Sequence, residues 1–214
     1  MVSVNFLLLL LMLPPLALMA ILLDRSARKI LLFLLFGMIT AFLSGQINTL
    51  LISDGGITSF DASIHVIPII EEFLKAFPVV AYVLVLRPKS RETIEYAVAI
   101  GLGFAFFENM WIFSQNFYGV PAWEDVLFAL SRGLGASMVH SLCTAILVSG
   151  VSVCLKSRKL LLTGTFALFS LVCLFHSLFN VLVGSDRSFL ALVLTLGTYA
   201  VVLVIAKRGG KYEK

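Results

Sequence analysis

The chain has 214 residues, of which 60% are hydrophobic and 13% are charged. The apolar residues come in runs of about 20, the length that crosses a bilayer as a helix, so the composition excludes an ordinary water-soluble protein. The formal charge of +4 does not indicate a nucleic-acid partner, and we expect none, because the basic residues lie between the apolar runs and are explained by membrane topology.

Seven apolar segments predict an all-α fold, a polytopic membrane helix bundle with about seven transmembrane helices in one domain over residues 1–214. The first segment has charged residues only after it, the reverse of a cleavable signal peptide, so we expect it to be retained. Pro14 and Pro15 predict a kink in its middle. The predicted spans are residues 2–23, 30–52, 66–86, 94–117, 133–155, 160–183 and 188–206.

Basic residues gather in every second connection and in the C-terminal tail, whereas the other connections are mostly acidic. By the positive-inside rule, this alternation predicts an N-terminus outside the cytoplasm and a cytoplasmic C-terminus. We therefore expect a multi-pass protein of the cell membrane that is surrounded by lipid. The basic groups are Arg25, Arg28 and Lys29, then Arg87, Lys89 and Arg91, then Lys156, Arg158 and Lys159, and finally Lys207, Arg208, Lys211 and Lys214.

The connection before the fifth span has the sequence of a helix start. Pro121, Glu124 and Asp125 are residue types that favour the first turn of a helix. We predict a short helix at the membrane surface over residues 121–132, with Gly133 and Gly135 as the hinge into the fifth span. In the fourth span, Gly101, Gly103 and Ala105 give one thin flank and predict close approach of a neighbouring helix.

Several ionisable residues lie inside the apolar segments. They are Glu71, Glu72 and Lys75 in the third span, Glu108 in the fourth, His140 in the fifth and His176 in the sixth. On insertion scales, one charge at the bilayer centre costs about 2.5 to 3.5 kcal/mol, so these positions indicate a function. The structural alternative is that the groups pair to hold the helices together, for example Glu71 with Lys75 one turn later.

The depth of these residues argues for a shared site. At 1.5 Å per residue, the carboxyl and imidazole groups of all four spans lie roughly 7 to 14 Å below the outer surface. Such a layer is what a water-filled cavity open to the outside requires. Asn180 lies four residues after His176, on the same helix face, and can offer an amide beside the imidazole. His65 falls at the edge of the third span, and we expect it at the membrane interface.

Four motifs occur on these spans in a fixed order. They are Glu71-Glu72-Phe73-Leu74-Lys75, then Phe107-Glu108-Asn109, then Arg132 followed by His140, then His176-x-x-x-Asn180. Together they resemble the PrsW family of intramembrane proteases, relatives of the CAAX prenyl protease and bacteriocin-processing superfamily. The resemblance covers roughly residues 65–185, and it implies a membrane-embedded endopeptidase with its catalytic core in that region.

The resemblance also implies roles for the residues that match the motifs. Glu71, with His140, would activate a water for attack on the peptide carbonyl. His176 and Asn180 would stabilise the oxyanion, and Glu72 and Glu108 would orient the site or pass protons to the leaving amine. The implied substrate is a transmembrane protein, similar to an anti-sigma factor, and the depth of the layer places its cleavage near the extracytoplasmic face.

The sequence leaves the metal question open between no cofactor and a divalent metal such as zinc. His140, His176 and Glu108 are the candidate metal ligands, because two histidines and a carboxylate form a catalytic zinc set. We favour glutamate-type catalysis over a metal. Cys143 and Cys173 lie one turn deeper than the two histidines and could add soft ligands, although buried cysteines are ordinarily small apolar residues.

Two other classes of function are compatible with intramembrane glutamates and histidines. A proton-coupled transporter or channel also uses such groups, but a conduction path needs polar residues across the whole depth, and the inner halves of these spans offer almost none. A non-catalytic binding or immunity protein on a protease fold is disfavoured because no expected catalytic position is substituted.

Overall fold

The computed structural model describes residues 23–86, 90–116, 123–155, 157, 159–185 and 187–209, and every regular element in these ranges is a helix. The all-α prediction is therefore confirmed for this part of the chain. The predicted span at residues 2–23, with Pro14 and Pro15, lies outside the described residues except for its last position. The helices are α2 (Arg25–Gly55), α3 (Ser59–His65), α4 (Ile67–Leu86), α5 (Ser90–Asn116), α6 (Trp123–Cys154), α7 (Leu161–Gly184) and α8 (Ser188–Gly209).

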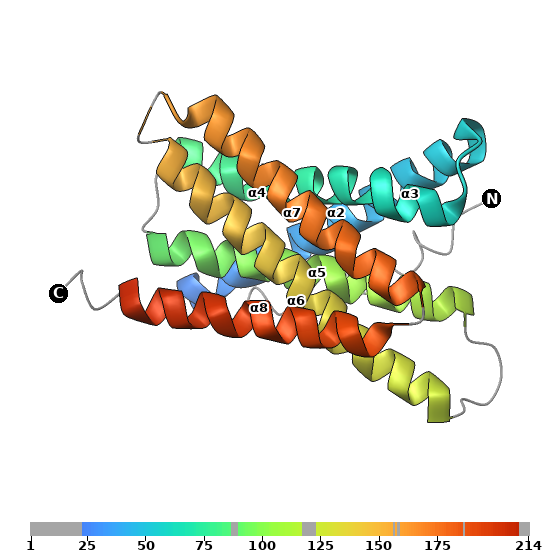
Figure 1. Ribbon diagram of the computed structural model, residues 1–214. Coiled ribbons are helices and arrows are strands. Elements are labelled where there is room, and N and C mark those ends of the chain that lie inside the picture. The colour runs from blue at the N-terminus through green and yellow to red at the C-terminus, as the bar shows by residue number, and fades with distance from the viewer. Residues whose placement is uncertain are drawn as a thin grey trace.

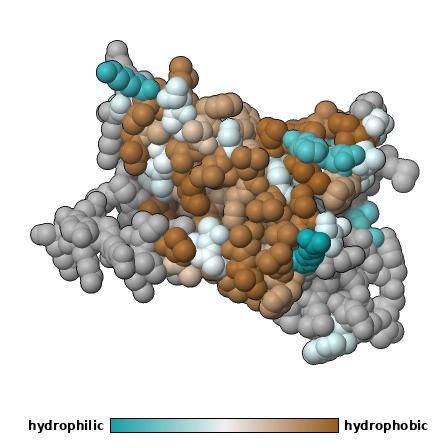
Figure 2. All heavy atoms as spheres, viewed as in Figure 1, coloured by the Kyte–Doolittle hydropathy of each residue, from teal (hydrophilic) through white to brown (hydrophobic). Residues whose placement is uncertain are grey.

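Four of these helices contain a stretch that is long and apolar enough to cross a membrane. The stretches are Arg25–Ser53, Glu92–Gln115, Arg132–Cys154 and Leu161–Gly184, and α8 adds a shorter apolar stretch, Phe189–Val201. Hydrophobic residues cover the middle of the face shown in Figure 2, and hydrophilic residues lie toward its margins. The described part of the chain is therefore a helical membrane protein.

Successive long helices alternate in direction along the bundle (Figure 1). α5 packs between α2 and α6, while α7 and α8 both pack against α6. α4 contacts α5, α6 and α7, so the four helices that carry the ionisable residues are neighbours in space. The short helix α3 joins α2 to α4 and packs against α7.

The turn from α2 into α3 is set by local sequence. Gly56 ends α2 with a φ of 62°, a left-handed conformation that glycine adopts without a steric penalty. Thr58 then caps α3, because its hydroxyl accepts a hydrogen bond from the backbone N–H of Asp61 at 3.1 Å. This turn brings the end of α2 beside the start of α4.

Glycines allow the central helices to approach closely. A Cβ at Gly103 would overlap the backbone carbonyl of Leu34 in α2, and a Cβ at Gly101 would overlap the backbone of Ser141 in α6. In the same way, a Cβ at Gly37 of α2 would overlap the backbone carbonyl of Ile100 in α5. The predicted close approach at the fourth span is confirmed, and it holds α5 against both of its neighbours.

The predicted hinge before the fifth span is wrong. α6 is one continuous helix of 32 residues, from Trp123 to Cys154, with no break at Gly133 or Gly135. Gly135 instead allows the ring of Phe179 in α7 to pack close, since an added Cβ would lie 3.2 Å from its Cε2 atom. A helix of this length is about 48 Å long, so its first turns extend past a hydrocarbon core of about 30 Å.

Candidate active site

The ionisable residues of four helices converge on one cluster. α4 supplies Glu71, Glu72 and Lys75, α5 supplies Glu108, α6 supplies His140 and α7 supplies His176. All of these except Glu108 are buried. His65 is exposed in the last turn of α3 and is not part of this group, and its place at the membrane interface stays a prediction. The layer predicted from depth alone is thus a set of contacting side chains.

Lys75 and Glu72 form a fully buried ion pair within the cluster. Lys75 Nζ is 2.6 Å from Glu72 Oε1, and both side chains are 0% exposed. The pairing suggested by sequence spacing was Glu71 with Lys75, but the structure joins Lys75 to Glu72. The ammonium also lies over the ring of Phe104, 4.7 Å from its centroid. Desolvated charges of this kind are stable only when each is paired, as here.

His140 lies between Lys75 and Glu108. Its Nδ1 is 2.6 Å from Lys75 Nζ, and its Nε2 is 2.9 Å from Glu108 Oε2. An ammonium can only donate and a carboxylate can only accept, so Nδ1 is the acceptor and Nε2–H donates to Glu108. The other oxygen of Glu108, Oε1, is held by Arg132 at 2.9 Å. Both nitrogens of His140 are therefore engaged.

His176 has the opposite arrangement. Its Nδ1 is 2.7 Å from Glu72 Oε1, and because the carboxylate accepts, Nδ1 carries the hydrogen. Nε2 then presents its lone pair to Glu71, whose Oε2 is 3.7 Å away. Among the described residues, Glu71 Oε2 is buried without a hydrogen-bond partner. Two acceptor atoms thus face each other across a gap that suits a donor.

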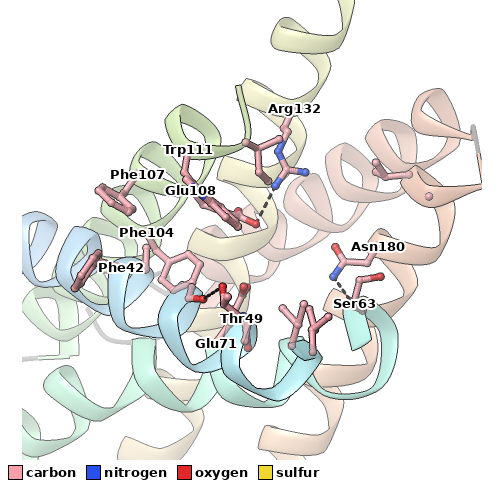
Figure 3. A pocket seen from close by; sticks show the side chains of 18 residues that line it. Phe42, Thr49, Ser63, Glu71, Phe104, Phe107, Glu108, Trp111, Arg132 and Asn180 are labelled. Carbon is pink, nitrogen blue, oxygen red and sulfur yellow. Dashed lines mark hydrogen bonds and ion pairs between the residues drawn. The ribbon is translucent and has the colours of Figure 1, made fainter. Parts of the chain in front are cut away.

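A cavity of about 320 Å³ opens beside this pair (Figure 3). Glu71, Glu108, Arg132 and Asn180 line it, whereas Glu72 is fully buried behind its wall. In Figure 3 the aromatic side chains lie on one side of the cavity, and Asn180 lies on the other. The aromatic residues are Phe42, Phe104, Phe107 and Trp111.

Asn180 lies where the sequence placed it, at the cavity, but its amide has a structural partner. Asn180 Nδ2 donates to the backbone carbonyl of Ser63 in α3 at 2.8 Å. Ser177, one turn earlier, donates to the carbonyl of Ile64 at 2.7 Å. These bonds tie α7 to α3, and they leave one amide hydrogen of Asn180 for another acceptor.

The residues that could hold a metal differ from the predicted set. The cluster of His, Cys, Asp and Glu groups found in the described part of the chain is Glu71, His140 and His176, whose ligand atoms lie within 4.8 Å of one another. Glu71 thus replaces the predicted Glu108, which is held by Arg132 and His140. Two imidazoles and one carboxylate match the ligand types of a catalytic zinc site.

The two cysteines do not join this set. Cys143 Sγ contacts the carbonyl of Val172 at 3.7 Å, and Cys173 Sγ contacts the carbonyl of Pro68 at 3.8 Å. Both are buried free thiols. The hypothesis of four converging soft ligands is therefore wrong, because the metal-capable group found among the described residues contains neither cysteine.

One wall of the cavity was missed by sequence reasoning. α2 contributes Ala41, Phe42, Gly45, Asn48, Thr49 and Ile52 to the lining. The second span carries no charged residue in this stretch, so the cost of placing a charge in the bilayer does not mark it as a functional segment. The signal that could have found it is the pair Ser44 and Asn48, two buried polar residues four apart in an apolar run.

The fold and the site define a helical membrane protein in which a buried cluster of acidic and imidazole groups lies beside an open cavity. Residues 25–206 match the family model of the PrsW family intramembrane metalloproteases. The chain belongs to this family and is a membrane protease. Searches of curated proteins and of solved structures found no significant match.

Proposed function

We propose that the protein is an intramembrane endopeptidase in which Glu71 activates the attacking water. The observation that carries the proposal is the 3.7 Å separation of Glu71 Oε2 from His176 Nε2 beside the cavity. A water can donate one hydrogen to each of these acceptors. Its oxygen is then directed at a peptide carbonyl held in the cavity.

The reaction follows from this placement. Glu71 takes a proton from the water as the oxygen bonds to the carbonyl carbon, giving a tetrahedral oxyanion. The proton then passes from Glu71 to the leaving nitrogen as the C–N bond breaks, which yields a carboxylic acid that keeps the second hydrogen of the water, and a neutral amine. Transfer of that hydrogen to the amine gives the final carboxylate and ammonium groups. Proton balance needs no further acid. In this scheme Glu71 is paired with His176, rather than with His140 as the resemblance implied.

Oxyanion stabilisation requires donors that face the cavity. His176 holds its hydrogen on Nδ1 toward Glu72, so its Nε2 is not a donor. Asn180 has a second amide hydrogen, and Arg132 has guanidinium donors beyond the one that binds Glu108. We assign the oxyanion to these two residues. One such donor is worth roughly 3 to 4 kcal/mol of transition-state stabilisation.

Glu72, Lys75 and Glu108 act as positioning residues in this proposal. Glu72 fixes the tautomer of His176 in the way that a carboxylate orients a catalytic histidine. Lys75 neutralises Glu72 and donates a hydrogen bond to Nδ1 of His140. Glu108 joins His140 to Arg132 and so places the guanidinium at the cavity.

Metal-dependent hydrolysis is the second candidate, favoured by the proximity of Glu71, His140 and His176. A zinc ion held by these residues would supply a hydroxide at neutral pH by acidifying a bound water. His176 presents a free Nε2 lone pair for such a role. His140 does not, because Lys75 and Glu108 engage both of its nitrogens. This asymmetry is why we place glutamate-type catalysis first.

The proposed substrate is a transmembrane protein in the cell membrane, similar to an anti-sigma factor by family analogy. The α4 residues of the cluster lie within the first turns of that helix, near the bundle end where α2 and α7 terminate. With the orientation expected from the basic residues, this end is extracytoplasmic. No observation on the described residues favours the transporter alternative.

Cleavage of a panel of transmembrane peptides in detergent tests the proposal. Wild type should cleave at least one peptide, and Glu71→Gln should not, while both remain folded. Glu92→Gln, the same exchange near the start of α5 and away from the cavity, is the matched control and should cleave normally. A strong chelator should leave wild-type cleavage unchanged under the glutamate scheme and abolish it under the metal scheme. Cleavage by Glu71→Gln at the wild-type rate would overturn both.

A further inference from the structure

One face of α2 forms a wall of the cavity without contributing any residue to the acid–imidazole cluster. Its lining residues are Ala41, Phe42, Gly45, Asn48, Thr49 and Ile52. Their spacing of three and four places them on a single helix face, with Gly45 near its middle. This face requires an explanation other than the chemistry of hydrolysis.

Asn48 and Thr49 are the polar residues of that face, and the hydroxyl of Thr49 donates to the backbone carbonyl of Gly45 at 2.7 Å. Asn48 is 8% exposed, and its Nδ2 donates to Ser44 Oγ at 3.1 Å. Its amide oxygen is buried and has no hydrogen-bond partner among the described residues. A buried carbonyl oxygen without a donor is unfavourable, so its position in the cavity wall indicates a ligand that donates a hydrogen bond.

Gly45 leaves room on the same face. A Cβ at Gly45 would meet no atom within 4 Å, whereas a Cβ at Gly37 in the same helix would overlap the carbonyl of Ile100. Packing therefore requires glycine at Gly37 but not at Gly45. The space beside Gly45 belongs to a cavity whose other walls include the aromatic residues Phe104 and Phe107. It suits a large apolar side chain.

We propose that this face of α2 selects the substrate. The space at Gly45 receives a large apolar side chain next to the scissile bond, and the amide oxygen of Asn48 accepts a hydrogen bond from a backbone N–H of the same extended segment. The inference rests on the proposed protease function and names the class of residue that the enzyme prefers at the cleavage site.

Selectivity profiling tests the side-chain site. Transmembrane peptides that differ only in carrying Ala or Phe at positions flanking the cleaved bond are compared for wild type, Gly45→Ala and Gly45→Leu. The ratio of kcat/KM for the Phe peptide to that for the Ala peptide should fall at least about tenfold in Gly45→Leu and less in Gly45→Ala. Gly197→Leu, at a helical glycine of α8 that also has open space, should leave the ratio unchanged.

The outcomes separate this inference from the proposed function. If wild type cleaves no peptide, the protease mechanism fails and the selectivity inference fails with it. If wild type cleaves but the ratio is the same in both Gly45 variants, only the role of α2 is overturned. If folded Gly45→Ala cleaves the Ala peptide and the Phe peptide equally poorly, the inference is also contradicted. Filling space at Gly45 should hinder only the peptide with the large side chain.

A second measurement isolates Asn48. Replacing one backbone N–H of the peptide by an ester oxygen should lower wild-type kcat/KM by about five- to tenfold at a single position near the cleaved bond. In Asn48→Ala, the same ester should cause no further loss at that position. Thr40→Val removes a buried polar group two turns earlier on α2 and outside the cavity, and it should respond to the ester as wild type does. An ester effect that persists in Asn48→Ala contradicts the hydrogen bond.

Discussion

Lys75 Nζ lies 2.6 Å from His140 Nδ1, although the two residues come from different helices, α4 and α6. The same ammonium holds Glu72, which in turn holds His176. One buried cation therefore orients both imidazoles of the site, directly for His140 and through Glu72 for His176. The reactive geometry depends on a lysine that does not line the cavity.

Lys75→Met should destabilise the protein by about 3 to 5 kcal/mol, because it leaves the carboxylate of Glu72 buried without a cation. Unfolding in mixed micelles with increasing denaturing detergent measures this change. Lys159→Met, at an exposed lysine, is the control and should change stability by less than about 0.5 kcal/mol. Adding Glu72→Gln to Lys75→Met should recover part of the loss. A Lys75→Met protein as stable as wild type would show that the pair does not hold the cluster.

Gly103→Ala should lower stability by about 1 to 3 kcal/mol, since the new methyl group overlaps the backbone of Leu34 and forces α2 away from α5. Gly197→Ala in α8 meets open space and should be neutral or stabilising, by up to about 1 kcal/mol. The same unfolding assay compares the two. Equal effects at both positions would mean that α2 and α5 are not in the close contact described.

The sequence predicted the layer of the site but not its connections. Charged residues inside apolar runs are visible without coordinates, and helix rise alone gives their depth. Which glutamate contacts which histidine depends on the rotation of each helix about its axis, which the sequence does not give. The structure was therefore needed to show that Lys75 pairs with Glu72, and that Glu71 takes the place of Glu108 in the metal-capable group.

Two other features lay beyond sequence reasoning for physical reasons of their own. Gly133 and Gly135 looked like a hinge, because a glycine serves either bending or packing and its neighbours decide which. The α2 wall was missed because Asn48 is a neutral amide with a far smaller insertion penalty than a charge. The glycine pattern of the fourth span, by contrast, correctly predicted close packing.

Arg132→Gln should reduce kcat by about a hundredfold, because Glu108 loses its cation and the cavity loses a charged donor. Arg132→Lys should recover only part of the activity, since an ammonium is a point charge without the planar fork of a guanidinium. Steady-state kinetics on one cleaved peptide give kcat and KM for both variants. Arg187→Gln, at an exposed arginine before α8, should behave as wild type. An unchanged kcat in Arg132→Gln would remove this residue from the mechanism.

The double variant Cys143→Ser, Cys173→Ser should retain cleavage within about threefold of wild type, because both thiols face backbone carbonyls and neither belongs to the metal-capable group of Glu71, His140 and His176. Its metal content by elemental analysis should equal that of wild type, whatever that value is. Loss of a bound metal together with activity in the double variant would restore the cysteines as ligands.

The most direct test of the central claim, that Glu71 and His176 act on one water, is a double-mutant cycle in kcat/KM. Glu71→Gln and His176→Gln should each lower kcat/KM by about a thousandfold or more, and the double variant should be no worse than the poorer single one, because residues that act as a unit lose their effect together. Losses that multiply in the double variant, or substantial cleavage by either folded single variant, would contradict the shared water.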